Sequence, residues 1–143
     1  GRLGVASRSV GVIHACLQDS VAYAQERMAF GHPISEFQLV QSKITDMSVG
    51  LETASLLVRE CAEALERGER ARRLTSMAKM YASDIAARSA ADAVQIHGAY
   101  GASSDYRVSR MYRDAKVLQI VEGSNDLHRA LIGETNLGLR SGA

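Results

Sequence analysis

The stretch FQLVQSKITDMSVGLETASLLVRECAEAL, residues 37–65, decides the fold. Its apolar side chains recur at alternating steps of three and four residues, without a miss: Phe37, Val40, Ile44, Met47, Leu51, Ala54, Val58, Cys61 and Leu65. This spacing predicts one long helix whose apolar face packs nearly parallel against neighbouring helices, as in a bundle. Ser35 is expected to cap its start, Gln38 to close a capping box and Gly68 to end it.

Helical patterns lie on both sides of this stretch. One amphipathic face runs from the start of the chain to about Met28, where Gly31 and Pro33 interrupt it. A third stretch, residues 71–97, is rich in alanine, and small side chains let neighbouring helices approach closely, so we place it centrally.

The last part of the chain holds shorter elements. Residues 98–105 form a loop, a short helix covers about 108–115, and a final helix runs from about 124 to 137. The predicted fold is all-α: an up-and-down four-helix bundle with short extra C-terminal helices, in which residues 1–143 form one domain.

Composition narrows the class of protein. The 143 residues are 46% hydrophobic and 23% charged, which is typical of a single soluble globular domain. A net charge of +1 gives no reason to expect nucleic acid or an anionic membrane as a partner, and no apolar run is long enough to span a bilayer. The chain begins with glycine instead of methionine, so we expect a domain of a longer protein.

The cysteines and histidines do not indicate a disulfide, a redox pair or a metal site. Cys16 and Cys61 occupy apolar helical positions, which favours buried thiols in a cytoplasmic protein over a disulfide or a redox pair. The cysteines and the four histidines do not cluster at metal-ligand spacing, so no metal site is predicted. His97 and His128 are expected to be structural or exposed.

Three segments, in order and spacing, resemble signatures of the acyl-CoA dehydrogenase C-terminal domain. They are YAQERMAFGHPISEFQLVQSKITDM (23–47), DAVQIHGAYG (92–101) and YRDAKVLQIVEGS (112–124). The resemblance covers nearly the whole chain but only the last of the family's three domains, because the N-terminal helical and middle β domains are absent here.

The resemblance implies desaturation of an acyl thioester between its α and β carbons, with FAD as hydride acceptor. Glu122 falls where the family carries its catalytic base, and the apolar run before it would remove water from the carboxylate and strengthen it as a base. Gly123 would let the backbone approach the substrate, where the N–H of Glu122 could donate to the thioester carbonyl. The alternative is a solvated glutamate before a helix that Ser124 caps.

Two residues at the start of the chain bear on the same site. Some family members place the base on the first helix of this domain, and that position corresponds to Gly1, which has no side chain to serve. Arg2 matches an arginine that lies close to the base in related enzymes, the alternative being an exposed residue at a helix start. Arg113 and Asp114 are expected to form a salt bridge that positions the loop carrying Glu122.

The resemblance also implies a set of FAD contacts. Arg27 matches an arginine that binds the FAD pyrophosphate, where a guanidinium suits phosphate oxygens. The other contacts it implies are Phe30, Gln38, Gln95, Gly98 and, beside the cofactor, Ser124. Two positions depart from the family's common pattern. Ala99 replaces a glycine and so adds a methyl group, and Asp126 replaces a Glu or Gln and is one methylene shorter than the residue that often reaches the adenine side.

Family relationships imply partners as well. In the family, five of these residues reach the FAD of a neighbouring subunit, so a homodimer or homotetramer is expected. They match Arg27, Phe30, Gln38, Gln95 and Gly98. The substrate would be a thioester of coenzyme A or of an acyl carrier protein in fatty acid metabolism, and the electron acceptor an electron-transfer flavoprotein.

Other functions remain open on the sequence. One is a non-catalytic helical interaction module of the same fold, and another is an oxidase or flavin monooxygenase relative. Glu122 together with Arg27 and Gln95 favours the dehydrogenase, although the 143-residue chain alone is expected to be inactive. Acyl chain length and the carrier stay open.

Overall fold

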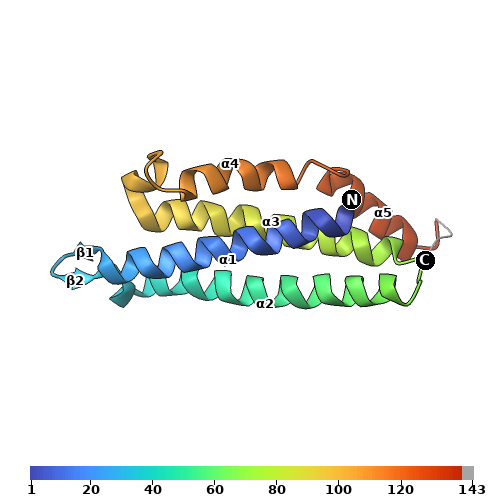
Figure 1. Ribbon diagram of the computed structural model, residues 1–143, viewed down its shortest axis with the longest axis horizontal. Coiled ribbons are helices and arrows are strands. Elements are labelled where there is room, and N and C mark those ends of the chain that lie inside the picture. The colour runs from blue at the N-terminus through green and yellow to red at the C-terminus, as the bar shows by residue number, and fades with distance from the viewer. Residues whose placement is uncertain (140–143) are drawn as a thin grey trace.

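The computed structural model describes residues 1–139, and this part of the chain contains five α-helices (Figure 1). They are α1 (Arg2–Glu26), α2 (Gln38–Glu66), α3 (Arg72–His97), α4 (Val108–Leu118) and α5 (Asn125–Asn136). The first four run up and down along one axis, and α5 folds back at the end where the chain begins. The predicted all-α four-helix bundle with short extra C-terminal helices is confirmed as a fold, and α5 is the one such extra helix within residues 1–139.

Short elements join the helices. A two-residue antiparallel pair, β1 (Met28–Ala29) and β2 (His32–Pro33), and a 3₁₀ turn, η1 (Ile34–Glu36), connect α1 to α2. A second 3₁₀ turn, η2 (Gly98–Ala102), follows α3. The β pair was not predicted, because two residues a strand are too few to show alternation.

The alanine-rich helix α3 lies at the centre of the bundle, as predicted, and packs against α1, α2, α4 and α5. Its fully buried small side chains form a stripe: Ala78, Ala82, Ala86, Ala90 and Ala93. Such side chains allow close helix–helix contact, and larger residues of the neighbouring helices fill the space between.

The periodic face of α2 also packs as predicted. Met47, Ala54 and Cys61 are buried, whereas Leu65, at the end of the series, is 43% exposed. Gly50 adds a contact that the pattern did not indicate. A Cβ on Gly50 would lie 2.5 Å from Cγ2 of Ile85 on α3, so the absence of a side chain lets α2 and α3 approach each other.

The start of α2 differs from the prediction. Ser35 belongs to η1, and the N-cap is Phe37, which makes no side-chain capping bond. The expected capping box of Ser35 and Gln38 is therefore wrong. Ser35 contributes its carbonyl instead, which accepts a hydrogen bond of 3.0 Å from Nε2 of Gln41. At the other end Gly68 follows the helix with a φ of +75°, as expected for a glycine stop.

Both cysteines are buried free thiols, as predicted. The Cys16 thiol lies 3.6 Å from the Met111 sulfur, and burial, with a smaller contribution from Asp19, raises the pKa of Cys16 to about 12. This thiol therefore stays protonated at neutral pH. Within residues 1–139, no helix is long and apolar enough to cross a membrane.

Candidate functional site

The candidate site residues divide between the two ends of the bundle. Gly1 and Arg2 begin α1, and Arg27 follows its last residue. A helix of 25 residues is about 37 Å long. The loop with Glu122 lies at the first of these ends, beside the N-terminus, and the β1–β2 turn lies at the other (Figure 1).

The backbone at Glu122 has an uncommon conformation. Glu122 has a φ of +57° and Gly123 a φ of +95°, so two consecutive residues occupy the left-handed region. Glycine adopts this region readily, but a glutamate there stores strain that the surroundings must hold. Such non-glycine residues are concentrated at functional sites. The structure thus gives a reason, independent of the motif, to regard Glu122 as functional.

Side chains from other elements hold the carbonyls of this turn. The ammonium group of Lys79 donates to the carbonyl oxygen of Gly123 at 2.8 Å, and Nε2 of His128 donates to that of Glu122 at 3.1 Å. Burial, opposed by the hydrogen bond to Glu122, lowers the pKa of His128. Ser124 caps α5 by accepting a hydrogen bond from the N–H of Leu127, a feature of the alternative interpretation in which Glu122 is a solvated residue before a helix.

The carboxylate of Glu122 reaches the start of α1. A Cβ on Gly1 would lie 2.0 Å from Oε2 of Glu122, so the carboxylate occupies the space that a side chain at position 1 would need. The predicted burial of this group is not seen in the domain. Glu122 is exposed, and the apolar residues before it are themselves exposed, Val117 by 52% and Ile120 by 57%.

One of two expectations about charged residues at this end needs correction. Arg2 directly follows Gly1, whose space the Glu122 carboxylate occupies, and its guanidinium donates to Oγ of Ser76 at 3.1 Å instead of pairing with Glu122 in the described residues. The expected salt bridge of Arg113 with Asp114 is absent from the described residues, where both side chains are exposed. The loop is held by Lys79 and His128, which the sequence analysis did not assign to it.

At the other end, Arg27 lies beside η2. Its guanidinium carbon is 5.8 Å from the centre of the Tyr100 ring, and no carboxylate pairs with it in the described part of the chain. Arg27, Gly98 and Ala99 line a cavity of about 210 Å³. An adjoining cavity of about 630 Å³ is lined by Arg27, Tyr100 and other residues. The structure therefore brings Arg27 and Gly98 together at one cavity.

The remaining three predicted cofactor residues at this end are exposed. Phe30 is 94% exposed at the tip of the β1–β2 turn and has a φ of +54°. Gln38 and Gln95 are exposed as well, and neither lines the two cavities. An aromatic side chain held almost wholly in water on a strained turn is typical of a surface that contacts a partner or ligand.

Comparison with known proteins decides the family. Residues 1–137 match the family described as acyl-CoA dehydrogenase, C-terminal domain. This chain belongs to the acyl-CoA dehydrogenase family. An acyl-CoA dehydrogenase of Bacillus subtilis is 44% identical over 138 residues, which cover 96% of this chain and 36% of the relative. The chain thus spans about a third of the length of its curated relatives.

Two other members of the acyl-CoA dehydrogenase family are similarly close. A subunit of the caffeyl-CoA reductase–Etf complex of Acetobacterium woodii is 46% identical over 132 residues, covering 92% of this chain and 35% of that protein. The structure of butyryl-CoA dehydrogenase from Megasphaera elsdenii superimposes with a TM-score of 0.93 at 40% identity, covering 96% of this chain and 36% of that one.

Proposed function

We propose that this chain is the C-terminal domain of a flavin-dependent acyl thioester dehydrogenase in which Glu122 removes the α-proton of the substrate. One observation carries the proposal. Glu122 is held in a left-handed turn with its carboxylate against the glycine at position 1, which corresponds to the family's alternative location for the base. Carboxylates placed at either position would reach the same space.

The chain's own groups have defined tasks in this reaction. An oxygen of the Glu122 carboxylate accepts the α-proton, which is only weakly acidic until the thioester carbonyl is polarised. The backbone N–H of Glu122 makes no hydrogen bond within residues 1–139, so it is available to donate to that carbonyl oxygen. When FAD is bound, it supplies the acceptor for the hydride that leaves the β carbon.

The other end of the bundle suits the adenosine diphosphate part of FAD. Arg27 offers a guanidinium with no carboxylate partner among the described residues, which fits a pyrophosphate. Four exposed residues at the same end would complete the contacts: Phe30, Gln38, Gln95 and Gly98. Ser124 would contact FAD at the other end of the bundle, beside Glu122.

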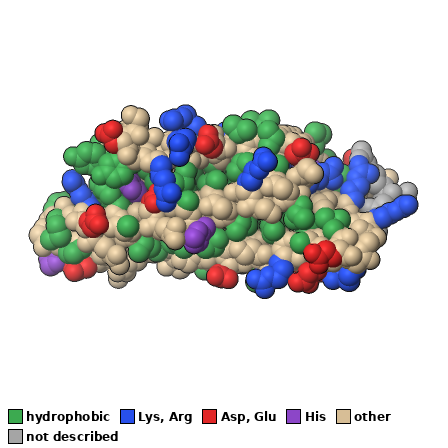
Figure 2. Space-filling view, viewed as in Figure 1, with side chains coloured by type: hydrophobic (Ala, Val, Ile, Leu, Met, Phe, Trp, Pro, Cys, Tyr) green, Lys and Arg blue, Asp and Glu red, His purple; other side chains and the backbone are tan. Residues whose placement is uncertain are grey.

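Because these two ends are about 37 Å apart along α1, one extended FAD molecule does not reach both. We therefore assign the two ends to the FAD molecules of different subunits in a homodimer or homotetramer. Exposed apolar side chains such as Phe30, Leu39 and Val49 support such an interface. Hydrophobic side chains also lie exposed between the charged ones in Figure 2.

The proposal extends to partners of the whole protein. The substrate is a thioester of coenzyme A or of an acyl carrier protein. An electron-transfer flavoprotein is the proposed electron acceptor, and the similarity to a subunit of a caffeyl-CoA reductase–Etf complex supports it. Free buried thiols suit a cytoplasmic setting.

The test is Glu122→Gln in the complete flavoprotein that carries this chain. Glutamine keeps the shape of the side chain but cannot accept the proton, so FAD should remain bound. Flavin bleaching by butyryl-CoA or octanoyl-CoA, followed by stopped-flow absorbance, should slow by about 10²–10⁴-fold. Glu66→Gln, an exposed glutamate at the end of α2, is the matched control and should bleach at the normal rate. Normal bleaching of Glu122→Gln would place the base elsewhere.

A further inference from the structure

Lys79 is a buried lysine in the first half of α3, and it is 0% exposed. Its ammonium group has three donors and makes three hydrogen bonds. It donates to the carbonyl oxygen of Gln119 at 3.0 Å, to that of Gly123 at 2.8 Å and to Oδ1 of Asn125 at 2.8 Å. Every donor of the buried ammonium group is therefore satisfied.

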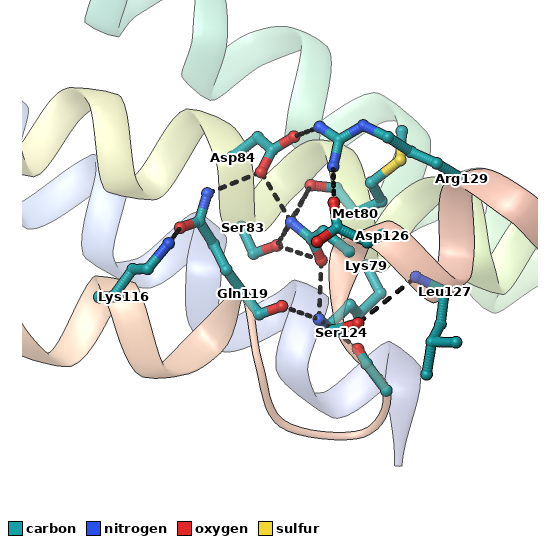
Figure 3. A network of polar contacts seen from close by, with 12 residues as sticks. Lys79, Met80, Ser83, Asp84, Lys116, Gln119, Ser124, Asp126, Leu127 and Arg129 are labelled. Carbon is teal, nitrogen blue, oxygen red and sulfur yellow. Dashed lines mark hydrogen bonds and ion pairs between the residues drawn. The ribbon is translucent and has the colours of Figure 1, made fainter.

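These three acceptors enclose the segment that carries Glu122. Gln119 directly follows α4, and Asn125 is the first residue of α5, so Lys79 ties both ends of the connecting loop to α3 (Figure 3). A buried ammonium group is costly to desolvate, and an apolar residue of similar volume would often be as stable. What the lysine adds is a fixed position for the loop.

The network continues beyond the ammonium group. Nδ2 of Asn125 donates to Oγ of Ser83 at 2.9 Å and to Oδ1 of Asp84 at 2.7 Å. The same Asp84 oxygen accepts from Nε2 of Gln119 at 2.7 Å. The other Asp84 oxygen pairs with Arg129 of α5. Side chains of α3 thus hold Gln119 and Asn125 through two sets of contacts, one from Lys79 and one from Ser83 and Asp84. Figure 3 shows Asp84 between Gln119 and Arg129.

The held carbonyls flank Glu122 directly. Lys79 fixes the carbonyl of the residue after it, and His128 fixes the carbonyl of Glu122 itself. Together they hold the peptide planes on either side of Gly123, which has a φ of +95° and directly follows the left-handed Glu122. Without Lys79, two loop carbonyls and an amide oxygen would lose their common donor, and this strained turn would relax.

We infer that Lys79 is a positioning residue for Glu122: its three hydrogen bonds hold the turn that aims the carboxylate at Gly1 and at the substrate. The inference rests on the proposed function of Glu122. Lys79 touches neither substrate nor reacting atoms, so its effect on the reaction is exerted through Glu122.

The experiment uses Lys79→Met in the complete flavoprotein, because methionine is long enough to fill the site but donates no hydrogen bond. The rate of flavin bleaching by butyryl-CoA, counted per bound FAD, should fall by about 10- to 100-fold, the effect expected of a misplaced catalytic group. Lys43→Met, which removes a lysine from α2 away from this loop, is the matched control and should bleach at the normal rate. A merely structural lysine would lower thermal stability and leave the rate per bound FAD unchanged.

A double-mutant cycle tests whether Lys79 acts through Glu122. In the Glu122→Gln background, Lys79→Met should cause no further loss of rate, because the group that it positions is already gone. Losses that multiply would overturn the inference. A Glu122→Gln variant with full activity would overturn the proposed function itself, whereas a slow Glu122→Gln with a fully active Lys79→Met would overturn only the role of Lys79.

A second variant covers the case in which Lys79→Met does not retain FAD. Lys79→Gln keeps two donors on a shorter side chain, so it can hold part of the network. A bleaching rate between those of the unmodified protein and Glu122→Gln supports the inference, and a rate equal to that of the unmodified protein overturns it.

Discussion

Gly1 and Glu122 are in contact across the start of the bundle, although 121 positions separate them in the sequence. A Cβ built on Gly1 would lie 2.0 Å from Oε2 and 2.5 Å from Cδ of Glu122. The glycine is therefore what allows the carboxylate to occupy this space. Since the contacting atoms are the end of a flexible side chain, a larger residue at position 1 would move the carboxylate and leave the fold intact.

The first prediction follows from this contact. In the complete flavoprotein, Gly1→Ala should displace the Glu122 carboxylate and slow flavin bleaching by acyl-CoA by roughly 10- to 100-fold, because small misplacements of a catalytic group are costly. Thermal stability and FAD content should stay the same. Gly4→Ala, in α1, is the control, because a Cβ there would meet no atom of another element within 4 Å in the described residues. An unaltered bleaching rate in Gly1→Ala would show that the position of the carboxylate is not critical.

The second prediction concerns pH. Burial lowers the pKa of His128, so the folded protein keeps this side chain neutral at a pH where the unfolded chain, with a pKa near the ordinary 6.5, is protonated. The unfolded state then binds more protons, and the free energy of unfolding should fall as the pH drops from about 7 to 5. The expected slope due to His128 is at most about 1.4 kcal/mol per pH unit.

The geometry explains why a charged His128 is disfavoured. Nε2 donates to the carbonyl of Glu122, and Nδ1 is buried without a partner in the described residues, so a proton there would have no acceptor. Urea unfolding of the 143-residue chain and its His128→Gln variant at several pH values measures the difference. His14, His32 and His97 are present in both proteins and cancel. If both lose stability equally on acidification, His128 is not the group responsible.

Much of this architecture could be predicted from local pattern. Apolar residues three and four apart lie on the same face of a helix, and bundle helices pack through these faces. The packed faces could therefore be predicted from the spacing in residues 37–65 and from the alanines in residues 71–97. Helix starts were less predictable. Ser35 is a good capping residue, but the η1 turn moves it out of register, so the tertiary connection overrides the local preference.

Long-range polar contacts explain the rest of what was missed. In the sequence, Lys79 looks like an ordinary helical lysine. Its partners Gln119 and Gly123 lie 40 and 44 positions away, and only the fold places them at its ammonium group. One sequence signal was present: Lys79 lies between Ser76 and Ser83 on the face of α3 that is otherwise lined by alanine. The expected pairing of Arg113 with Asp114 failed for a related reason, because adjacent helical residues point in different directions.

The last prediction concerns Gly101, which lies in η2, beside Arg27. A Cβ on Gly101 would lie 2.4 Å from the carbonyl oxygen and 2.9 Å from Cα of Val94, both backbone atoms of α3 that no rotamer change can move. Gly101→Ala should therefore push η2 off α3 and lower the free energy of unfolding by about 1–3 kcal/mol. Because η2 carries Gly98 and Tyr100 beside Arg27, FAD affinity of the complete flavoprotein should fall as well.

Gly11→Ala is the matched control for this substitution. Gly11 lies within α1 with no atom inside 4 Å of its Cβ, so alanine there should stabilise the chain by about 0.5–1 kcal/mol through helix propensity. Urea unfolding of the two variants should thus shift in opposite directions from the unmodified chain. A Gly101→Ala variant as stable as Gly11→Ala would mean that η2 moves away from α3 at no cost, and that the close approach to Val94 does not hold η2 in place.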